Sequence, residues 1–291
     1  MTQPTVGGPW RRRARPLLGT LVEVGLLSRH DAAPVSLGSA LDSALEPAFE
    51  AAFEAVLAVQ ACLSRFDADS DVCRFHALAC GAAMRLRPAS RQVLMAAADL
   101  QDASDGLFDI SLGTAADGWR LDGEVLRKTH AQVRLDLGGI AKGHAVDLAV
   151  QALIGQGCTA GWVNAGGDLR AFGAVSLPVH LRDENDGGVR PFAMLQDGAF
   201  ASSHFGTGAR MALFNRANGA NRADRADRAD RANRADRANR ADRAARQRPC
   251  CQVSVAAPLC LWADALTKVV ALAGDSAAAL LARYGATAWQ H

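Results

Sequence analysis

The segment Asp136–Asp147, with the sequence DLGGIAKGHAVD, constrains the fold most, because it places three glycines and a lysine between two regular elements. Val133–Leu137 alternates apolar and polar residues, which predicts a short strand. Beyond the glycines, apolar residues recur at the spacing of an amphipathic helix that Gly155 and Gly157 can end: Val146, Ala149, Val150, Leu153 and Ile154. The sequence therefore predicts strand, glycine-rich loop and helix in succession.

This loop has the features of an anion-binding turn. Glycine lets a backbone approach a ligand closely, and free N–H groups at a helix start attract phosphate, so the loop suits a nucleotide pyrophosphate. It contains neither GxGxxG nor GxxxxGK[ST], and an ordinary tight turn is the alternative. Lys142 favours the first interpretation over a solvated lysine, because the helix dipole disfavours a cation there unless an anion is present. His144 is expected at the surface.

A second glycine-rich block, Val163–Gly173 (VNAGGDLRAFG), predicts a strand, a turn and another strand, with Asp168 bracing the turn. Further strands are predicted over five ranges: Leu17–Leu27, Val179–Arg182, Phe192–Leu195, Ala199–Ser203 and Gln252–Ala257.

Helical spacing predicts three further helices, over Leu41–Leu63, from Ser90 to Gly106, and over Leu261–Leu272. Pro47 is expected near the start of the first, and Ser90 is expected to cap the second. Ser70 is expected to cap a short turn that ends at Phe75.

Composition is that of an ordinary globular chain. The 291 residues are 49% hydrophobic and 21% charged, and a net charge of +2 favours neither nucleic acid nor an anionic membrane surface. No run of eighteen apolar residues occurs, so no membrane span is predicted. The seven cysteines form no CxxC pair and no metal spacing, which favours free buried thiols over a disulfide framework.

The two glycine blocks closely resemble the ApbE family, the FAD:protein FMN transferases. Further matching segments occur in the family's order: Leu17–Thr20, Leu63–Phe66, Asp71–Phe75, Gly106–Ile110 and Ala263–Leu266. The resemblance covers roughly residues 11–213 and 250–285. It implies an α+β fold, with a largely antiparallel sheet and flanking helices, as a single domain over residues 11–285.

The resemblance also implies a reaction. FAD would bind with Mg²⁺, a Thr or Ser hydroxyl of a target protein would attack the FMN-side phosphorus, and AMP would leave. The family match implies FAD contacts at these positions: Leu18, Phe66, Leu107, Phe108, Asp109, Asp136, Lys142 and Lys268. It implies that Asp264, the Gly139 carbonyl and Thr267 hold Mg²⁺, a cation that prefers oxygen ligands.

Several of these positions have a plain structural alternative. Phe66 could pack at a helix end, and Asp109 could cap a turn. Lys268 stands where the family commonly has a threonine ligand; either Thr267 replaces that ligand or the Lys268 ammonium neutralises part of the diphosphate. A surface ion pair between Lys268 and Asp264 is the alternative. Ser202 and Ser203 are candidates to touch phosphate or the acceptor, or are buried strand serines.

The chain departs from the family at Leu213–Gly219, where most members have a block close to HIIDPRTG. A leucine replaces the histidine and an asparagine replaces the acid, and asparagine cannot act as a general base. An FAD-binding protein that has lost transfer, or that hydrolyses FAD slowly, is therefore the alternative function.

A low-complexity run of Arg-Ala-Asp and Arg-Ala-Asn triplets occupies Arg222–Arg246, within an insertion over residues 216–248. Its period leaves no apolar stripe to bury, which predicts disorder. An interaction protein that uses this repeat is a further alternative; nucleic-acid binding is not predicted, because no aromatic residues interleave the arginines.

Trp10–Arg15 could belong to a twin-arginine signal, but Leu17–Leu27 reads as a strand, so the expected location is cytoplasmic, or periplasmic if the true start lies upstream.

Overall fold

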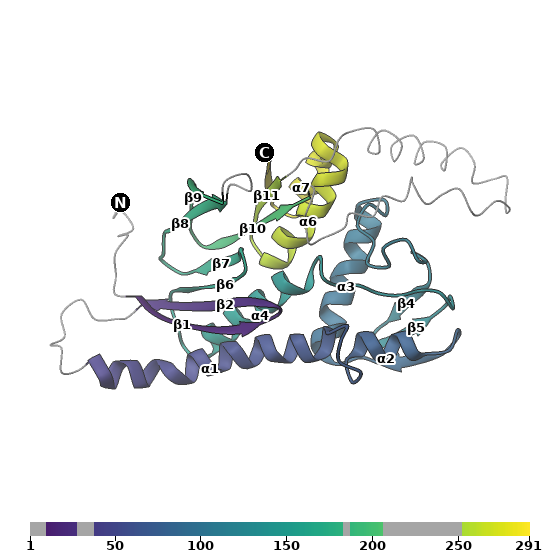
Figure 1. The fold of residues 1–291 in the computed structure, drawn as a ribbon, viewed down its shortest axis with the longest axis horizontal. Helices are drawn as coiled ribbons and strands as arrows, with labels where there is room; N and C mark the ends of the chain where they lie inside the picture. Colours follow the sequence, from purple (N-terminus) through teal and green to yellow (C-terminus); the bar gives the residue numbers. More distant parts are fainter. Residues whose placement is uncertain (1–9, 28–37, 183–186, 206–251) are drawn as a thin grey trace. The chain divides into compact units, whose positions relative to one another are not determined.

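The structure is a computed structural model that describes residues 10–27, 38–182, 187–205 and 252–291 (Figure 1). The chain divides into two compact units. Unit 1 comprises the described parts of Met1–Gln60, Lys142–Ser202 and Val255–Asp264, and unit 2 those of Ala61–Ala141, Ser203–Ser254 and Ala265–His291. Leu213–Gly219, the arginine repeat, Cys250 and Cys251 lie outside the described residues.

Unit 1 contains most of a seven-stranded sheet in the order β1-β2-β6-β7-β10-β11-β12. Its strands are β1 (Trp10–Leu17), β2 (Thr20–Leu27), β6 (Gly161–Ala165) and β7 (Asp168–Phe172), with parts of β10 (Gly198–His204) and β11 (Gln252–Ala257). Residues 203–204 of β10 and 252–254 of β11 belong to unit 2. From β1 to β10, neighbours in this order pair antiparallel. A separate hairpin joins β8 (Leu177–Arg182) and β9 (Val189–Leu195). These pairings confirm the α+β fold with a large antiparallel sheet, and with it the predicted strand–turn–strand block.

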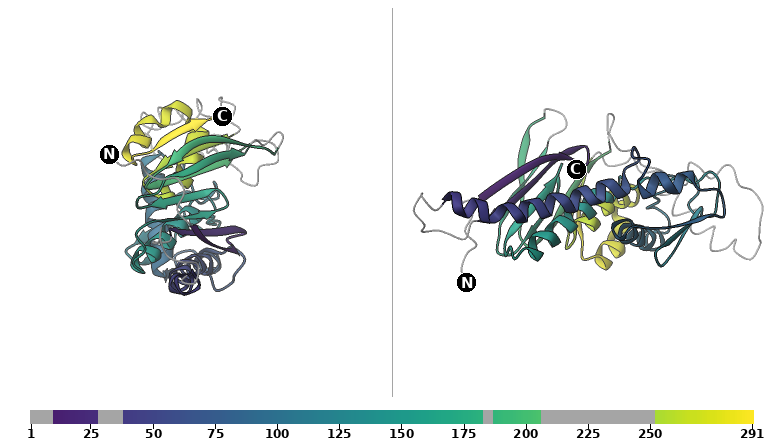
Figure 2. Two further views of the ribbon diagram at one scale, coloured as in Figure 1. Left: turned by 90° about the vertical axis from the view of Figure 1, so that its left-hand side faces the viewer. Right: turned by 90° about the horizontal axis from the view of Figure 1, so that it is seen from below.

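The predicted strand Leu17–Leu27 starts too early, because Leu18 and Gly19 form a turn and the strand β2 begins at Thr20. Leu17 ends the preceding strand β1, which pairs back on β2. Helix α1 (Gly38–Leu63) runs beside these strands in each view of Figures 1 and 2. Arg13 and Arg15 of β1 pair with Glu46 and Glu50 of α1. The prediction that Pro47 lies near the start of this helix is wrong. The helix extends back to Gly38, so Pro47 lies inside α1.

Helix α4 (Ala141–Gly155) begins five residues before the predicted start at Val146, so Lys142 and Gly143 lie in its first turn. Helix α6 (Cys260–Ala273) agrees with the predicted helix to within one residue at each end. Gly143 is where the start of α4 meets the start of α6. A Cβ at this position would lie 2.3 Å from the carbonyl oxygen of Cys260, so close packing requires a glycine here.

Unit 2 contains helices α2 (Asp71–Ala77), α3 (Pro88–Ala103), η4 (Gly274–Ala277) and α7 (Ala278–Arg283). Its strands are β3 (Ala83–Arg85), β4 (Trp119–Asp122) and β5 (Val125–Lys128), in the order β3-β5-β4, and β12 (Thr287–Gln290). Ser70 caps α2 as predicted, accepting from Cys73 N at 3.0 Å. The predicted cap at Ser90 is wrong: α3 begins at Pro88, and Arg87 holds the cap position. Proline suits a first helical turn, where no N–H partner is needed.

The described cysteines are free thiols, as predicted, but the expectation that they are buried holds for Cys62 and Cys260 only. Cys73 and Cys158 are half-buried, and Cys80 is exposed. Within the described residues, one helical stretch, Cys260–Arg283, is long and apolar enough to cross a membrane by length and composition. More than half of its most apolar window is buried, and core helices pass the same test. The absence of a membrane span therefore stays a prediction.

Replacing Gly143 by alanine should destabilise the protein by roughly 1–3 kcal/mol, because the added methyl group would overlap the Cys260 carbonyl. Gly155→Ala is the matched control: it lies at the other end of α4, and a Cβ there would meet nothing within 4 Å. The free energy of unfolding from urea titration measures both variants. Equal stability of the two would contradict the close helix contact.

Candidate functional site

Helices α4 and α6 cap each other within unit 1. The Asp147 carboxylate of α4 accepts hydrogen bonds from the first N–H groups of α6, 3.0 Å from Cys260 N and 2.9 Å from Leu261 N. In return, Asp264 Oδ2 of α6 accepts from Gly143 N in the first turn of α4, at 3.2 Å. Carboxylates stabilise helix N-termini because they satisfy free N–H groups and oppose the positive end of the dipole. The chain therefore supplies the anion at each of these helix starts.

Cations accompany both carboxylates. Arg170 of β7 lies 2.7 Å from Asp147 Oδ1, while Lys142 contacts Asp168 and lies 3.8 Å from Asp264 Oδ2. Burial alone would lower the pKa of Lys142, but the charges of Asp264 and Asp168 outweigh burial and raise it. The alternative of a solvated lysine is therefore wrong. The expectation of a surface His144 is also wrong, since that side chain is buried.

The same burial affects a neighbouring thiol. Cys260, at the start of α6, has no exposed surface. Burial, followed by the charges of Asp168, Asp147 and Asp264, raises the pKa of the Cys260 thiol well above its ordinary value. This cysteine therefore stays protonated, as expected of a structural thiol.

The predicted FAD contact at Leu18 lies in the turn between β1 and β2, with φ at 55°, an uncommon conformation for leucine. Its N–H donates to Gln60 Oε1 of α1 at 2.6 Å. A pocket in unit 1 is lined by residues 16–21 and Gln60. The second glycine turn also packs closely in this unit, because a Cβ on Gly166 would lie 2.4 Å from Thr20 Oγ1.

In the described part of unit 2, the residues before the first glycine block have no strand partner. Three consecutive N–H groups donate to acceptors outside any strand ladder: Arg134 N to Thr114 Oγ1 (3.0 Å), Leu135 N to His76 Nε2 (2.8 Å) and Asp136 N to Ile110 O (2.7 Å). The predicted strand Val133–Leu137 is therefore wrong, although its alternation of buried and exposed side chains is right.

The Asp136 carboxylate makes two contacts in unit 2. Its Oδ1 accepts from Gly138 N at 2.8 Å, and its Oδ2 lies 3.5 Å from an Arg65 guanidinium nitrogen. The Arg65 guanidinium also lies 4.9 Å from the centre of the Phe66 ring. Arg65 therefore touches both Asp136 and Phe66, two predicted FAD contacts.

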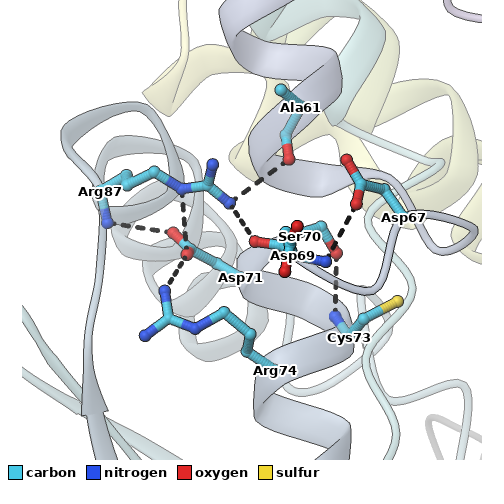
Figure 3. Close-up of polar contacts among 8 residues, drawn as sticks. All are labelled: Ala61, Asp67, Asp69, Ser70, Asp71, Cys73, Arg74 and Arg87. Carbon is cyan, nitrogen blue, oxygen red and sulfur yellow. Dashed lines mark hydrogen bonds and ion pairs between the residues drawn. The ribbon is translucent and has the colours of Figure 1, made fainter.

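Phe66 is 86% exposed, so the alternative that it packs at a helix end is wrong. Its loop is nevertheless tightly held. Ser64 Oγ accepts from Phe66 N at 3.1 Å, and Arg87 donates to the carbonyls of Ala61 and Asp69 while it pairs with buried Asp71 (Figure 3). An exposed phenyl ring on an ordered loop leaves an aromatic face available for stacking.

Asp109 does what its structural alternative predicts. Its Oδ1 accepts from Ser111 N at 2.8 Å and its Oδ2 from Gly113 N at 3.1 Å, so the buried carboxylate fixes a turn. Phe108 is buried beside it and Leu107 is half-buried.

Residues of unit 2 from β10, from α6 and from the loop before α4 lie around Lys268 of α6. Its Nζ donates to Ser203 Oγ of β10 at 3.3 Å, and Ser203 Oγ lies 2.9 Å from Thr267 Oγ1. A Cβ built on Gly139 would lie 3.5 Å from Lys268 Cε. Lys268 is 7% exposed and Asp264 is fully buried, so the predicted alternative, an ion pair at the surface, is wrong.

The predicted metal ligands, a carboxylate, a hydroxyl and a backbone carbonyl, have the all-oxygen chemistry that Mg²⁺ prefers. Asp264 belongs to unit 1, and Gly139 and Thr267 belong to unit 2. Among the described residues, no three His, Cys, Asp or Glu side chains group as a metal site would require. The predicted set does not depend on such a group, because it contains one carboxylate.

Several contacts were not foreseen from the sequence. Asp147 and Arg170 lie 23 residues apart, and His76 and Leu135 lie 59 apart. No local sequence motif predicts these pairs. A signal was present for Asp147 alone, since an acidic residue on the apolar side of a predicted helix requires a partner when it is buried.

The fold and these sites define a class of α+β protein with two glycine-rich segments and an exposed aromatic loop. A sequence model of the ApbE family matches residues 18–205. The chain belongs to the ApbE family.

Relatives of known sequence and structure agree with this. The chain is 28% identical over 155 residues to a FAD:protein FMN transferase from Rhodobacter capsulatus; the match covers 42% of this chain but only 30% of that protein. Among solved structures, the fold resembles the apo form of flavinyl transferase ApbE from Pseudomonas stutzeri (TM-score 0.68, 19% identity, 96% of this chain and 89% of that one). It also resembles flavin transferase ApbE from Vibrio cholerae (TM-score 0.70, 15% identity, 97% and 94%).

Replacing Lys142 by methionine should destabilise the protein by roughly 3 kcal/mol, because Asp168 and Asp264 would stay buried without this cation. The double variant Lys142→Met/Asp168→Asn should recover part of the loss. Arg85→Met, which removes an exposed pair with Glu124, is the control and should cost less than about 1 kcal/mol. Denaturant unfolding measures all three; wild-type stability in Lys142→Met would contradict the ion-pair role.

Proposed function

We propose that this protein transfers FMN from FAD to a Thr or Ser hydroxyl of a target protein, in a Mg²⁺-dependent reaction that releases AMP. The observation that carries the proposal is the family match over residues 18–205. Every predicted FAD contact except Lys268 lies within that range. The Rhodobacter capsulatus relative, whose name states this activity, adds support.

The step forms one bond and breaks one. The acceptor oxygen attacks the FMN-side phosphorus, the bond from that phosphorus to the oxygen bridging to AMP breaks, and the hydroxyl proton is lost to a base. Such a transfer depends mainly on positioning and charge neutralisation. Mg²⁺, when bound, would neutralise the diphosphate, and Asp264, the Gly139 carbonyl and Thr267 would hold it.

The chain's own residues would bind and orient the nucleotide. The exposed ring of Phe66 offers a stacking face to the flavin, and Arg65 steadies that ring. Lys268, buried beside Gly139, would place an ammonium near phosphate. Lys142 already carries its charge against Asp168 and Asp264, so a diphosphate there would share a cation with these carboxylates.

A second function is favoured by one sequence feature, the replacement of the histidine and acid of the family's block at Leu213–Gly219. A protein without that base would bind FAD without transfer, or hydrolyse it slowly. Purified protein incubated with FAD, Mg²⁺ and an acceptor domain separates these functions. Release of AMP with flavin covalently attached to the acceptor supports transfer, intact bound FAD supports the binder, and AMP with free FMN supports hydrolysis. Lack of FAD binding would overturn the proposal.

Replacing Phe66 by alanine should weaken FAD binding about threefold to tenfold, because a stacked aromatic pair contributes roughly 0.5–1.5 kcal/mol. Stability should stay within about 0.5 kcal/mol of wild type, since the ring is exposed. Met95→Ala, which removes another exposed apolar side chain, is the matched control. Fluorescence titration with FAD measures the affinity; equal affinities of Phe66→Ala and wild type would exclude Phe66 from the site.

A further inference from the structure

His76 lies in the last turn of α2 and acts as a hydrogen-bond acceptor. Its Nε2 accepts the N–H of Leu135 at 2.8 Å. Its own carbonyl accepts from Lys128 Nζ at 2.9 Å, and its ring meets the Phe75 ring at 62°. A ring nitrogen can accept only when it carries no proton. The observed contact therefore requires a neutral His76 with its proton on Nδ1.

The residue that follows Leu135 is Asp136, and it depends on the same set of contacts. Leu135 is buried, so its N–H has no access to water as a substitute acceptor. The neighbouring N–H groups of Arg134 and Asp136 are held by single contacts as well, to Thr114 Oγ1 and the Ile110 carbonyl. Among the residues that the structure describes, no strand ladder supports this segment. Loss of one contact therefore loosens the segment that carries Asp136.

The charges around His76 favour the neutral ring. Burial is the largest cause that lowers the pKa of His76 below its ordinary value of 6.5, and the cation Arg134 and then Lys128 lower it further. The backbone hydrogen bond with Leu135 and the charge of Asp136 raise the pKa but do not outweigh these effects. The neutral form is therefore complete above pH 6.5 and is lost as the pH falls through the lower native pKa.

We propose that His76 is a pH-sensitive positioning residue, whose neutral ring fixes Leu135 and thereby Asp136, and whose protonation releases this segment. The effect on FAD rests on the proposed function; the effect on Leu135 does not. Protonation converts the Nε2 acceptor into a donor that faces another donor. FAD affinity then falls on acidification, before the protein unfolds.

Three variants test this assignment. His76→Gln keeps an acceptor of similar reach that does not titrate, and His76→Leu removes the acceptor. His130→Gln is the control, because His130 also accepts a backbone N–H, from Gln132 at 3.2 Å, but is exposed. The first measurement is the hydrogen-exchange protection factor of the Leu135 amide between about pH 8 and pH 5, where histidines titrate. The second is the FAD dissociation constant over the same range.

In the wild type and in His130→Gln, Leu135 protection and FAD affinity should fall about threefold to tenfold on acidification, the factor for loss of one hydrogen bond. In His76→Gln both should stay high and independent of pH, and in His76→Leu both should be low throughout. If His76 had only a structural role, its titration would not cause the pH dependence. Leu135 protection and FAD affinity in His76→Gln would then still fall on acidification.

Two results would overturn the proposal: wild-type Leu135 protection that does not change with pH, or a His76→Gln profile equal to that of the wild type. If FAD fails to bind the wild type at any pH, the proposed function fails, while Leu135 exchange still decides the role of His76. If FAD binds but its affinity does not follow Leu135 protection, His76 does not position Asp136.

Discussion

The exchange of carboxylates between α4 and α6 is the interaction on which unit 1 depends. Asp147 accepts the first N–H groups of α6, and Asp264 accepts an N–H in the first turn of α4. Each helix thereby completes the hydrogen bonding of the other at a buried position, where an unsatisfied N–H is costly. The small volume of Gly143 lets the helix starts approach, and Lys142 and Arg170 offset the buried charge. Changing one member leaves another uncompensated.

This arrangement gives the glycine-rich segment at the start of α4 a structural role that is separate from the predicted role in phosphate binding. Glycine and lysine before a helix suggest phosphate, and the dipole argument for an anion beside Lys142 is correct. The anions beside Lys142 are Asp264 and Asp168, and Gly143 is required by the Cys260 carbonyl. In unit 2, by contrast, Phe66 is exposed and the Arg65–Asp136 pair is partly exposed. These residues are the better candidates for contact with a nucleotide.

Much of the fold is predictable from the sequence, because alternating and helical patterns report burial directly. The hairpin of β6 and β7, the β8–β9 pair and the extent of α6 all follow from periodicity. Val133–Leu137 shows the limit: its alternation is that of a strand, but its N–H groups pair with His76, Thr114 and Ile110. Periodicity reports which side chains are buried, not which acceptor each N–H finds. Asp109 shows the same limit for function, because turn fixation and ligand binding use the same carboxylate.

The capping pair also sets an order of folding. Asp147 and its partners in α6 are separated by 113 and 114 residues, so the contact is among the least local in unit 1. Contacts between distant residues form late, because the chain must first close a long loop. During synthesis, the strands before α4 leave the ribosome well before Asp264 does. Until then Asp147 lacks its two N–H donors and the N–H of Gly143 lacks its acceptor, and a chain with such unmet contacts is the kind of intermediate that chaperones bind.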